Sequence, residues 1–404
     1  MTIDNIQTVL WEQRLFSRLI ASLVLLAIPI GVPQAQEVGS NFNHVPETID
    51  FTYLEKANVD WIRVTPFILD YLDGKRPLKG AHGMDNIIEA DKRGYKVAFG
   101  FRWDFKKRNM RVPAPNSRAE KRLFDQARKM LKLVGPHIDI FKLGNEPYLE
   151  TLSVDLSKNA DKQIPIIVFT QRLLSEVVEP LYANHPKWKR PDVYVGSMVW
   201  LYERKMQKNV AILGLIHFAE THPAIKGVAL HIHARQADDI EASFTFLRQH
   251  LKHKPIIVPE FSLQRLHRSR LTEKLGTDKA GLAFARKYSR DPDMAMYEWY
   301  NHATRNTSQA QEWNDLLESR SWYPRNYMLR YYAAFEKYGV LLATYPLRFT
   351  RLPWLKPNSN TWFINPIFVT FPMTDKSGKP TEENPLSHQD FDTMVARGRA
   401  KLKE

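Results

Sequence analysis

The fold is decided by segments of the kind found at residues 138–147, which read IDIFKLGNEP. Apolar residues dominate this run up to Gly144, and it ends on Asn145 and Glu146 before a proline. An apolar run of this length that ends in turn-forming and polar residues predicts a buried strand opening into a loop. A series of such strands, separated by amphipathic stretches, predicts a parallel sheet built from strand–helix units.

The pattern of residues 138–144 recurs along the chain. Strands are predicted at 38–44, 59–65, 95–101, 138–144, 193–199, 227–233, 255–260 and 340–345. Helices are predicted from about 47, then over 83–93, 117–133, 162–184, 208–221, 237–252 and 387–403, with further helical segments before 337. A large insertion is expected over 262–293, and a long loop with Trp354 and Trp362 after the last strand.

Eight strands that alternate with helices predict a closed (β/α)8 TIM barrel with long insertions after strands seven and eight. The chain of 404 residues suits such a barrel as a single catalytic domain over 36–404. A doubly wound open sheet is the alternative. That fold ordinarily carries a glycine-rich phosphate turn after its first strand, and none is present here.

Composition narrows the class of protein further. Hydrophobic residues make up 44% of the chain and charged residues 25%, which is typical of a globular protein. The chain has no cysteine, which excludes disulfides, thiolate nucleophiles and cysteine-based zinc sites. A formal net charge of +14 favours anionic partners, among them acidic polysaccharides, nucleic acid and anionic lipid surfaces.

Residues 1–35 read as an export signal. Arg14 and Arg18 precede an apolar stretch over 19–32, which ends near small residues, as in a signal peptide. The stretch is shorter than the roughly 20 residues of a spanning helix, although Pro33 suits cleavage poorly and leaves an uncleaved anchor as the alternative. We therefore expect a periplasmic or secreted protein, with membrane contact only if this segment is retained.

Two glutamates stand at the ends of predicted strands. Glu146 follows strand four in the Asn-Glu-Pro sequence of 145–147, and Glu260 ends strand seven in the Pro-Glu-Phe sequence of 259–261. Catalytic groups of (β/α)8 barrels lie at the carboxyl ends of the strands. Because the two strands are three strand–helix units apart, their side chains are expected to meet across the mouth of the barrel.

These two motifs resemble the signatures of glycoside hydrolase clan A, a group of (β/α)8 retaining glycosidases. The resemblance covers the layout of nearly the whole chain after residue 36 but only short motifs in detail, and it identifies no single family. It implies that Glu146 is the acid/base and Glu260 the nucleophile. It also implies that Asn145 contacts the sugar 2-hydroxyl and that Arg63 supports the nucleophile.

The chemistry of retaining hydrolysis agrees with this assignment. It needs two carboxyls about 5–5.5 Å apart, one protonated and one ionised. An arginine such as Arg63 beside Glu260 would keep that carboxyl charged. Glu298, in a helical stretch, and Glu203, after strand five, are the rival carboxylates, and both are more typical of surface or capping residues.

Several other residues are candidates for substrate contact. His231 and His233 share one face of strand six, because side chains two residues apart point the same way. We expect them to form hydrogen bonds in the barrel mouth. A metal pair is the alternative, but no third ligand is evident from the sequence, so no metal or cofactor is predicted. Aromatic sugar platforms, with core packing as the alternative, are predicted at Trp103, Trp200, Tyr202 and Trp354.

Basic residues cluster in the loops after strands three, seven and eight. They are Arg102, Lys106, Lys107, Arg108 and Arg111, then Arg265, His267, Arg268, Arg270 and Lys274, and then Arg348, Arg351 and Lys356. The clusters predict an acidic bacterial polysaccharide or oligosaccharide as substrate, with a generic basic surface as the alternative.

Other functions are weighed against a glycosidase. A non-catalytic glycan-binding barrel would dispense with one carboxylate, and a metal-dependent hydrolase would need more histidine and aspartate at the strand ends. No nucleic-acid-binding motif is present, so nucleic acid is not expected as a partner. We expect a monomer.

Overall fold

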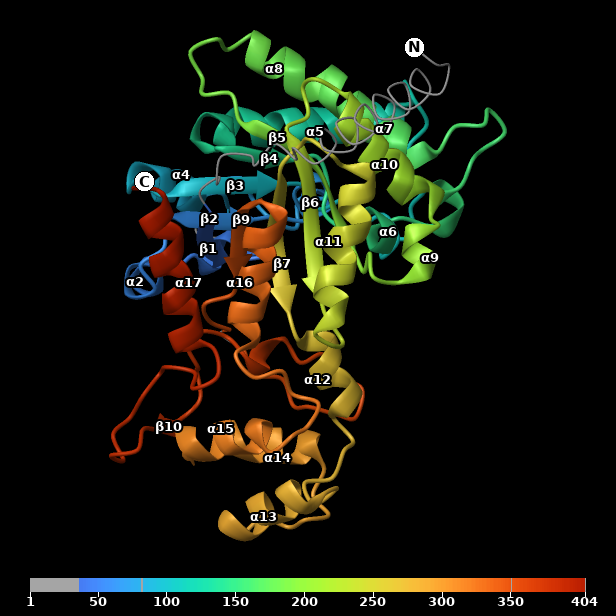
Figure 1. Cartoon of the computed structure of the whole chain (residues 1–404). Helices are drawn as coiled ribbons and strands as arrows, with labels where there is room; N and C mark the ends of the chain where they lie inside the picture. The colour runs from blue at the N-terminus through green and yellow to red at the C-terminus, as the bar shows by residue number, and fades with distance from the viewer. Residues whose placement is uncertain (1–35, 81–82, 350, 404) are drawn as a thin grey trace, which may run out of the picture.

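A computed structural model describes residues 36–80, 83–349 and 351–403, and its centre is a closed barrel of parallel strands (Figure 1). The strands follow one another around the barrel in sequence order, and the last pairs with the first. This arrangement confirms the predicted (β/α)8 TIM barrel. The strands are β1 (Glu37–Asn41), β2 (Trp61–Val64), β3 (Lys96–Gly100), β4 (Ile140–Lys142), β5 (Asp192–Val199), β6 (Gly227–His233), β7 (Ile256–Ser262) and β9 (Val340–Tyr345).

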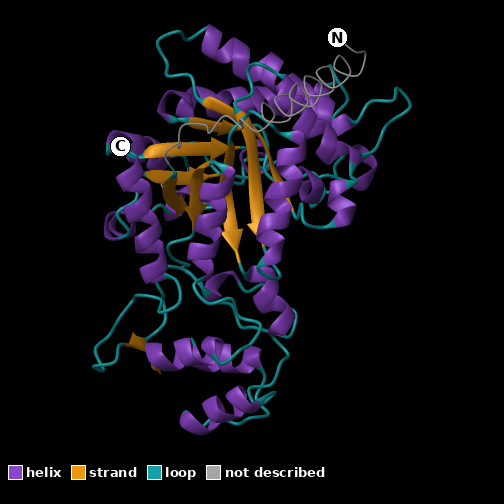
Figure 2. Cartoon of the chain, viewed as in Figure 1, coloured by secondary structure: helices purple, strands orange, loops and turns teal. Residues whose placement is uncertain are grey.

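Helices surround the strands on the outside of the barrel (Figure 2). The main ones are α2 (Phe51–Lys56), α4 (Asp85–Lys92), α5 (Arg118–Val134), α7 (Pro165–Leu173), α10 (Val210–Thr221), α11 (Asp238–His250), α16 (Tyr327–Tyr338) and α17 (His388–Lys401). Several begin at a local signal, because the side chains of Asp50, Ser117 and Asn209 accept hydrogen bonds from amides of the first turn. The predicted signal segment, residues 1–35, lies outside the described residues.

The helix predicted over 162–184 is divided in the structure. After α7 the chain forms a π-helical turn (Leu174–Val178) and then α8 (Glu179–Ala183). Pro180 accounts for the break, because proline has no amide hydrogen and its ring crowds the preceding turn. Shorter elements that were not predicted are η2 (Pro46–Thr48), α3 (Ile68–Leu72), η3 (Gly135–His137), α6 (Pro147–Glu150), η4 (Ser153–Leu156), α9 (Arg204–Gln207) and η6 (Trp362–Ile364).

The insertion after β7 is longer than predicted. It contains α12 (Gln264–Arg270), α13 (Lys279–Lys287), α14 (Met296–Ala303) and α15 (Ala310–Glu318) before α16 returns to the barrel. These helices lie beyond the carboxyl end of β7 (Figure 1). Two short strands, β8 (Ser308–Gln309) and β10 (Met373–Thr374), pair and join this insertion to the loop after β9. In the part of the chain described here, no helix has both the length and the apolarity that crossing a membrane requires.

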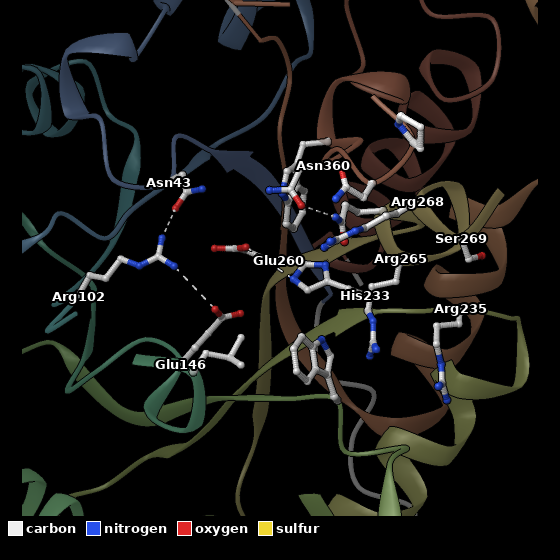
Figure 3. Close-up of a pocket in the computed structure, with 16 residues that line it drawn as sticks. Asn43, Arg102, Glu146, His233, Arg235, Glu260, Arg265, Arg268, Ser269 and Asn360 are labelled. Carbon is white, nitrogen blue, oxygen red and sulfur yellow. Dashed lines mark hydrogen bonds and ion pairs between the residues drawn. The ribbon is translucent and has the colours of Figure 1, made fainter. Parts of the chain in front are cut away.

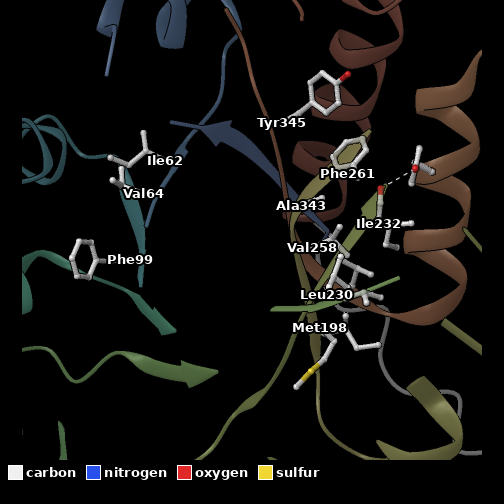
Figure 4. Packing of buried hydrophobic residues seen from close by; sticks show 14 of the residues in the cluster. Ile62, Val64, Phe99, Met198, Leu230, Ile232, Val258, Phe261, Ala343 and Tyr345 are labelled. Atoms are coloured by element: carbon white, nitrogen blue, oxygen red, sulfur yellow. Dashed lines mark hydrogen bonds between the residues drawn. The ribbon is translucent and has the colours of Figure 1, made fainter. Parts of the chain in front are cut away.

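The barrel interior changes character along the strands. Toward the amino ends of the strands, the interior is an apolar cluster formed by Trp61, Ala98, Ile140, Tyr194, Ala229, Ile257 and Leu342. Because side chains alternate along a strand, residues two positions further on also face the axis. On β2, β4 and β6 these residues are Arg63, Lys142 and His231. The outward side chains, such as Ile62, pack with the helices in a second and larger cluster (Figure 4). A layer of ionisable side chains therefore lies directly next to an apolar layer inside the barrel.

Irregular pairing sets the direction of Glu260. Ala229 pairs with Ile257, but two residues later His231 pairs with Glu260, so β7 contains one extra residue. This β-bulge brings Glu260, and not Pro259, onto the inward side. A similar shift occurs in β5 at Gly196, whose φ of +104° is a conformation that glycine adopts without strain.

Candidate active site

Two buried carboxylates lie together at the carboxyl ends of β4 and β7 (Figure 3). Glu146 immediately precedes α6, and Glu260 lies in β7; each is 7% exposed. One oxygen of Glu146 and one of Glu260 lie within 4.8 Å of each other. Pro147 occupies the first position of α6, where its fixed φ suits the start of a helix. The chain therefore turns directly after Glu146.

A fully buried arginine holds Glu260 in place. Arg63 Nη1 donates to Glu260 Oε1 at 2.5 Å and to Asn41 Oδ1 at 2.8 Å. Arg63 Nη2 donates to Asn145 Oδ1 at 2.7 Å. The guanidinium therefore joins residues from β1, β2, β7 and the end of β4. Its position agrees with the supporting role predicted for it.

Glu260 is the ionised member of the pair. Burial alone would raise the pKa of Glu260, but the basic groups around it, His231 and Arg63 first among them, hold that pKa well below its usual range. Burial in turn lowers the pKa of His231 well below its usual value, so the imidazole is neutral near pH 7. Arg63 therefore supplies the lasting positive charge beside Glu260.

The surroundings of Glu146 shift its pKa in the opposite direction. Burial and the negative charge of Glu260 raise the pKa of Glu146. Its Oε1 lies 2.9 Å from His231 Nδ1, and its Oε2 lies 3.7 Å from Arg102 Nη2. With Glu146 protonated, its hydroxyl can donate to the neutral imidazole. The environment thus shifts the pKa values of the two carboxyls in opposite directions.

The two histidines of β6 face Glu260. His231 Nε2 lies 3.8 Å from Glu260 Oε1, and His233 Nε2 lies 3.8 Å from Glu260 Oε2. His233 Nδ1 lies 2.9 Å from Ser262 Oγ. Burial lowers the pKa of His233 to about 4, so this ring is also neutral near pH 7. The expected place of both histidines in the barrel mouth agrees with these positions.

The structure supplies further metal-ligating groups that the sequence did not reveal. Glu146, His231, His233 and Glu260 each present one ligand atom, and these atoms all lie within 4.8 Å of one another. A cation bound there would compete with the Arg63 guanidinium for Glu260 and would face the nearby charge of Arg102. The arrangement therefore fits a carboxyl pair with charged supports better than a cage for a cation.

A network of charged and polar side chains next to Glu146 was not predicted from the sequence. Glu150 Oε1 accepts hydrogen bonds from Arg102 Nε at 2.6 Å and from Asn145 Nδ2 at 2.9 Å. Burial raises the pKa of Glu150 to about 7. Arg102 was placed only in a basic loop, although its position directly after strand three was the available signal.

Lys142 was also missed. It lies inside the barrel on β4, with Nζ 3.3 Å from Ser197 Oγ, and burial lowers its pKa well below the usual value. Gly100 on β3 leaves it space, because a Cβ there would lie 2.9 Å from Lys142 Cβ. A lysine at an inward position of an apolar strand was the signal that could have revealed it.

A cavity of about 670 Å³ opens above the two carboxylates. Glu146, Glu260, Trp200 and His233 line it, and so do arginines that follow β3, follow β6 and lie in α12 (Figure 3). These arginines are Arg102, Arg235, Arg265 and Arg268. A second cavity of about 230 Å³ adjoins it at Glu260. Reactive groups and open volume therefore coincide at the carboxyl face of the barrel.

The predicted aromatic platforms divide into two groups. Trp200 lines the larger cavity, and Arg265 stacks on its ring at 4.4 Å. Tyr202 lies behind it, where its hydroxyl donates to the His233 carbonyl at 3.0 Å. Trp103 is only 4% exposed and packs in the core, with its indole N–H donating to the Leu143 carbonyl. Trp354 is 62% exposed under Arg305 and lines neither cavity.

The amide of Asn145 is fully engaged within the protein. It accepts from Arg63 and donates to Glu150, and it does not line the larger cavity. The rival carboxylates lie elsewhere. Glu203 binds Arg265 at 2.6 Å, and Glu298 caps the first turn of α14 through the Ala295 amide.

No family model matches the sequence, and no curated protein matches it. Solved structures resemble the chain at low identity. Xylanase 10B from Thermotoga maritima is 10% identical over 91% of this chain and 96% of that one, with a TM-score of 0.47. A family 39 glycoside hydrolase from Bacteroides cellulosilyticus WH2 is 12% identical over 90% of this chain and 64% of that one, with a TM-score of 0.49. Endo-glycoceramidase II from Rhodococcus sp. is 12% identical over 82% and 77%, with a TM-score of 0.40.

Proposed function

We propose that this protein is a retaining glycoside hydrolase that cleaves O-glycosidic bonds in a polysaccharide by double displacement. One observation carries the proposal. Two buried carboxyls have oxygens within 4.8 Å of each other, and their surroundings raise the pKa of Glu146 and lower the pKa of Glu260. Retaining enzymes place their carboxyls about 5–5.5 Å apart, whereas inverting enzymes need about 6.5–9.5 Å to admit a water. The short separation favours a covalent intermediate.

In the first step, the Glu260 carboxylate attacks the anomeric carbon of the sugar. Protonated Glu146 gives its proton to the glycosidic oxygen, and the carbon–oxygen bond to the leaving group breaks. Arg63 keeps Glu260 ionised and fixes its orientation before the attack, and the two histidines face the same carboxylate at 3.8 Å. The result is a glycosyl ester on Glu260 and a deprotonated Glu146.

The second step reverses these roles. Esterification removes the negative charge of Glu260, which is one of the causes of the raised pKa of Glu146. The pKa of Glu146 therefore falls, and its carboxylate takes a proton from a water molecule that attacks the anomeric carbon. The ester bond breaks, Glu260 regains its charge, and Glu146 is again the acid.

An acidic polysaccharide, such as a bacterial exopolysaccharide, is the substrate that the charges of the cavity support. Four arginines line the larger cavity, and the carboxylates that line it are the two reacting ones. The basic loops identified in the sequence contribute only in part. Arg108 pairs with Asp70 and Asp73, and Lys274 with Asp293. The proposal of an anionic substrate therefore depends on the cavity and not on the overall charge.

We also propose export to the periplasm or the medium and action as a monomer. The support for export is the sequence pattern of Arg14, Arg18 and the apolar stretch over 19–32. A non-catalytic glycan-binding barrel is the competing function. A barrel that only binds glycans has no need for two buried carboxyls whose pKa values are shifted in opposite directions.

The proposed function is tested with a panel of 4-nitrophenyl glycosides and polysaccharides, followed by NMR of the first product. We expect the product to keep the anomeric configuration of the substrate, and we expect activity to persist in EDTA. A 2-deoxy-2-fluoro glycoside with a good leaving group should label Glu260. An inverted product, or a label on Glu298, would contradict the mechanism. Loss of activity in EDTA would favour a metal-dependent enzyme, and binding without turnover a glycan-binding barrel.

Arg63→Lys should move the acidic limb of the kcat/KM profile to higher pH by on the order of one unit. Glu260 must be ionised to attack, so activity is lost as the pH falls through its pKa. Lysine keeps a positive charge but loses the forked contact to Glu260 and Asn145. The pKa of Glu260 therefore rises, and activity at low pH is lost sooner. The measurement is kcat/KM as a function of pH.

Arg111→Lys is the matched control, since Arg111 pairs with Asp155 away from the cavity. Its acidic limb should stay where it is in the unmodified protein. An unchanged acidic limb in Arg63→Lys would mean that Arg63 does not set the ionisation of Glu260.

A further inference from the structure

The larger and the smaller cavity meet at Glu260. Both are lined by Asn43, Glu260, Asn360 and Trp362, so the two cavities adjoin at the proposed nucleophile. Glu146 lines only the larger cavity. The larger cavity therefore contains the proposed acid, and the smaller cavity does not.

The position of Glu146 indicates how a substrate would lie across the two cavities. The acid protonates the oxygen of the leaving group, so that oxygen must lie on the side of Glu146. The sugar that becomes bonded to Glu260 lies on the other side of the broken bond. The larger cavity therefore receives the leaving-group portion, and the smaller cavity extends from the sugar that forms the ester.

We propose that the enzyme binds an acidic sugar on the leaving-group side of the bond, through Arg235, Arg265 and Arg268. This proposal rests on the proposed glycosidase function and specifies where the charge of the substrate lies. These three side chains form the wall of the larger cavity opposite Arg102 (Figure 3). They come from the segment after β6 and from α12.

The charges of this wall are only partly neutralised. Arg265 binds Glu203 at 2.6 Å, and Arg235 lies 4.0 Å from Glu203 and 3.4 Å from Asp239. Arg268 is exposed and forms no ion pair within the described residues. A carboxylate entering this wall would find guanidinium groups, which bind it through paired hydrogen bonds.

Arg265 is also held in a defined orientation. Its Nη1 donates to Tyr202 Oη at 2.5 Å, and its guanidinium lies 4.4 Å from the centre of the Trp200 ring. Planar stacking and a fixed acceptor reduce the side-chain entropy that binding would otherwise cost. The wall is therefore partly ordered before a substrate arrives.

The smaller cavity has a different lining. Phe261, Phe349, Phe363, Pro346, Pro353 and Trp362 supply most of its walls. Arg351 is its one basic residue among those described. Its volume of about 230 Å³ lies below the roughly 300–1,000 Å³ of typical ligand pockets. It suits the apolar face of a short stretch of sugar better than a charged chain.

Reactivation of a trapped intermediate tests the leaving-group side alone. The enzyme is inactivated with the 2-deoxy-2-fluoro glycoside, which fills the sugar site next to Glu260. Methyl glucuronoside or methyl galacturonoside is then added as an acceptor, and each is compared with its neutral carboxamide. We expect at least one acid to restore activity about tenfold faster than its amide, the factor given by one charge-assisted hydrogen bond. The ratio should fall as NaCl is raised.

Variants locate the effect on the arginine wall. In Arg268→Gln and in Arg235→Gln the acid-to-amide ratio should fall toward one. Arg351→Gln, in the smaller cavity, is the matched control and should leave the ratio as it is in the unmodified protein. A ratio near one for every acid in the unmodified protein, or an equal fall in Arg351→Gln, would overturn this proposal while leaving the glycosidase intact. If no covalent intermediate forms at all, the proposed function fails as well.

Discussion

Replacing Glu260 with alanine should lower kcat by on the order of 10⁴-fold or more, the scale on which loss of a nucleophile is felt in enzymes with covalent intermediates. Without this carboxylate no glycosyl ester can form, and the supporting contacts of Arg63 cannot replace it. Sodium azide should restore turnover of an activated aryl glycoside, because the small anion fits the space left by the side chain. The product should then be a glycosyl azide of inverted configuration, which NMR detects.

Glu298→Gln is the matched control for this experiment. Glu298 is an exposed carboxylate that caps α14 and lines neither cavity. Its kcat should stay within twofold of the unmodified protein, as expected for a surface position. Full activity in Glu260→Ala, or inactivity of Glu298→Gln in a folded protein, would remove Glu260 as the nucleophile.

Replacing Glu146 with alanine should produce a loss that depends on the leaving group. A substrate whose leaving oxygen needs a proton should lose about 10²–10⁴-fold in kcat/KM, the contribution of general acid catalysis. A 2,4-dinitrophenyl glycoside needs no such proton and should form the ester at nearly the normal rate. Water then attacks slowly, and the glycosyl-enzyme accumulates to an extent that mass spectrometry can measure.

Two further results would separate this role from a structural one. The alkaline limb of the pH profile should disappear in Glu146→Ala, because that limb reports loss of the proton whose pKa is raised by burial and by Glu260. Azide should yield a product of retained configuration. Equal losses for all leaving groups would indicate damage to the site and not removal of an acid. Glu146→Gln, of the same size, guards against misfolding.

The sequence was sufficient to predict the barrel and its two central carboxylates. The alternation of apolar strands with amphipathic helices is a periodic signal, and the strands observed at 227–233 and 340–345 have the predicted bounds. Glu146 and Glu260 could be found because parallel strands bring their carboxyl ends together. The resemblance to clan A implied that Arg63 supports the nucleophile, and the two-residue period of strand six put His231 and His233 on one face.

Other parts of the site depend on contacts that no local pattern encodes. Trp103 and Trp200 both follow strands, yet one packs in the core and the other lines the cavity. The direction of each ring is decided by neighbours from distant segments, such as the Leu143 carbonyl that accepts from Trp103. Arg235 and Glu150 were missed for the same reason, since their partners come from separate loops.

The side chains that lie inside the barrel between the apolar cluster and the two carboxylates could have been predicted more fully. Lys142 follows Ile140 by two positions on β4, so an inward lysine above an inward isoleucine was implied by the alternation alone. The division of the helix over 162–184 was likewise implied by Pro180. An insertion after strand seven was predicted over 262–293, but its continuation through α15 was not, because that helix carries the same amphipathic pattern as the helices that cover the barrel.

Because β7 contains one extra residue, the direction of the Glu260 side chain depends on the number of residues between Ile257 and Glu260. In a regular strand, the residue two positions after Ile257 would face the axis, and that residue is Pro259. Deleting one residue between Ile257 and Glu260 would remove the bulge, and the glutamate, then two positions after Ile257, would still face the axis. Inserting one residue would turn it toward the helices. The composition of this segment can therefore vary over evolution or in engineering, but inserting a residue into it changes which side chain reaches the substrate.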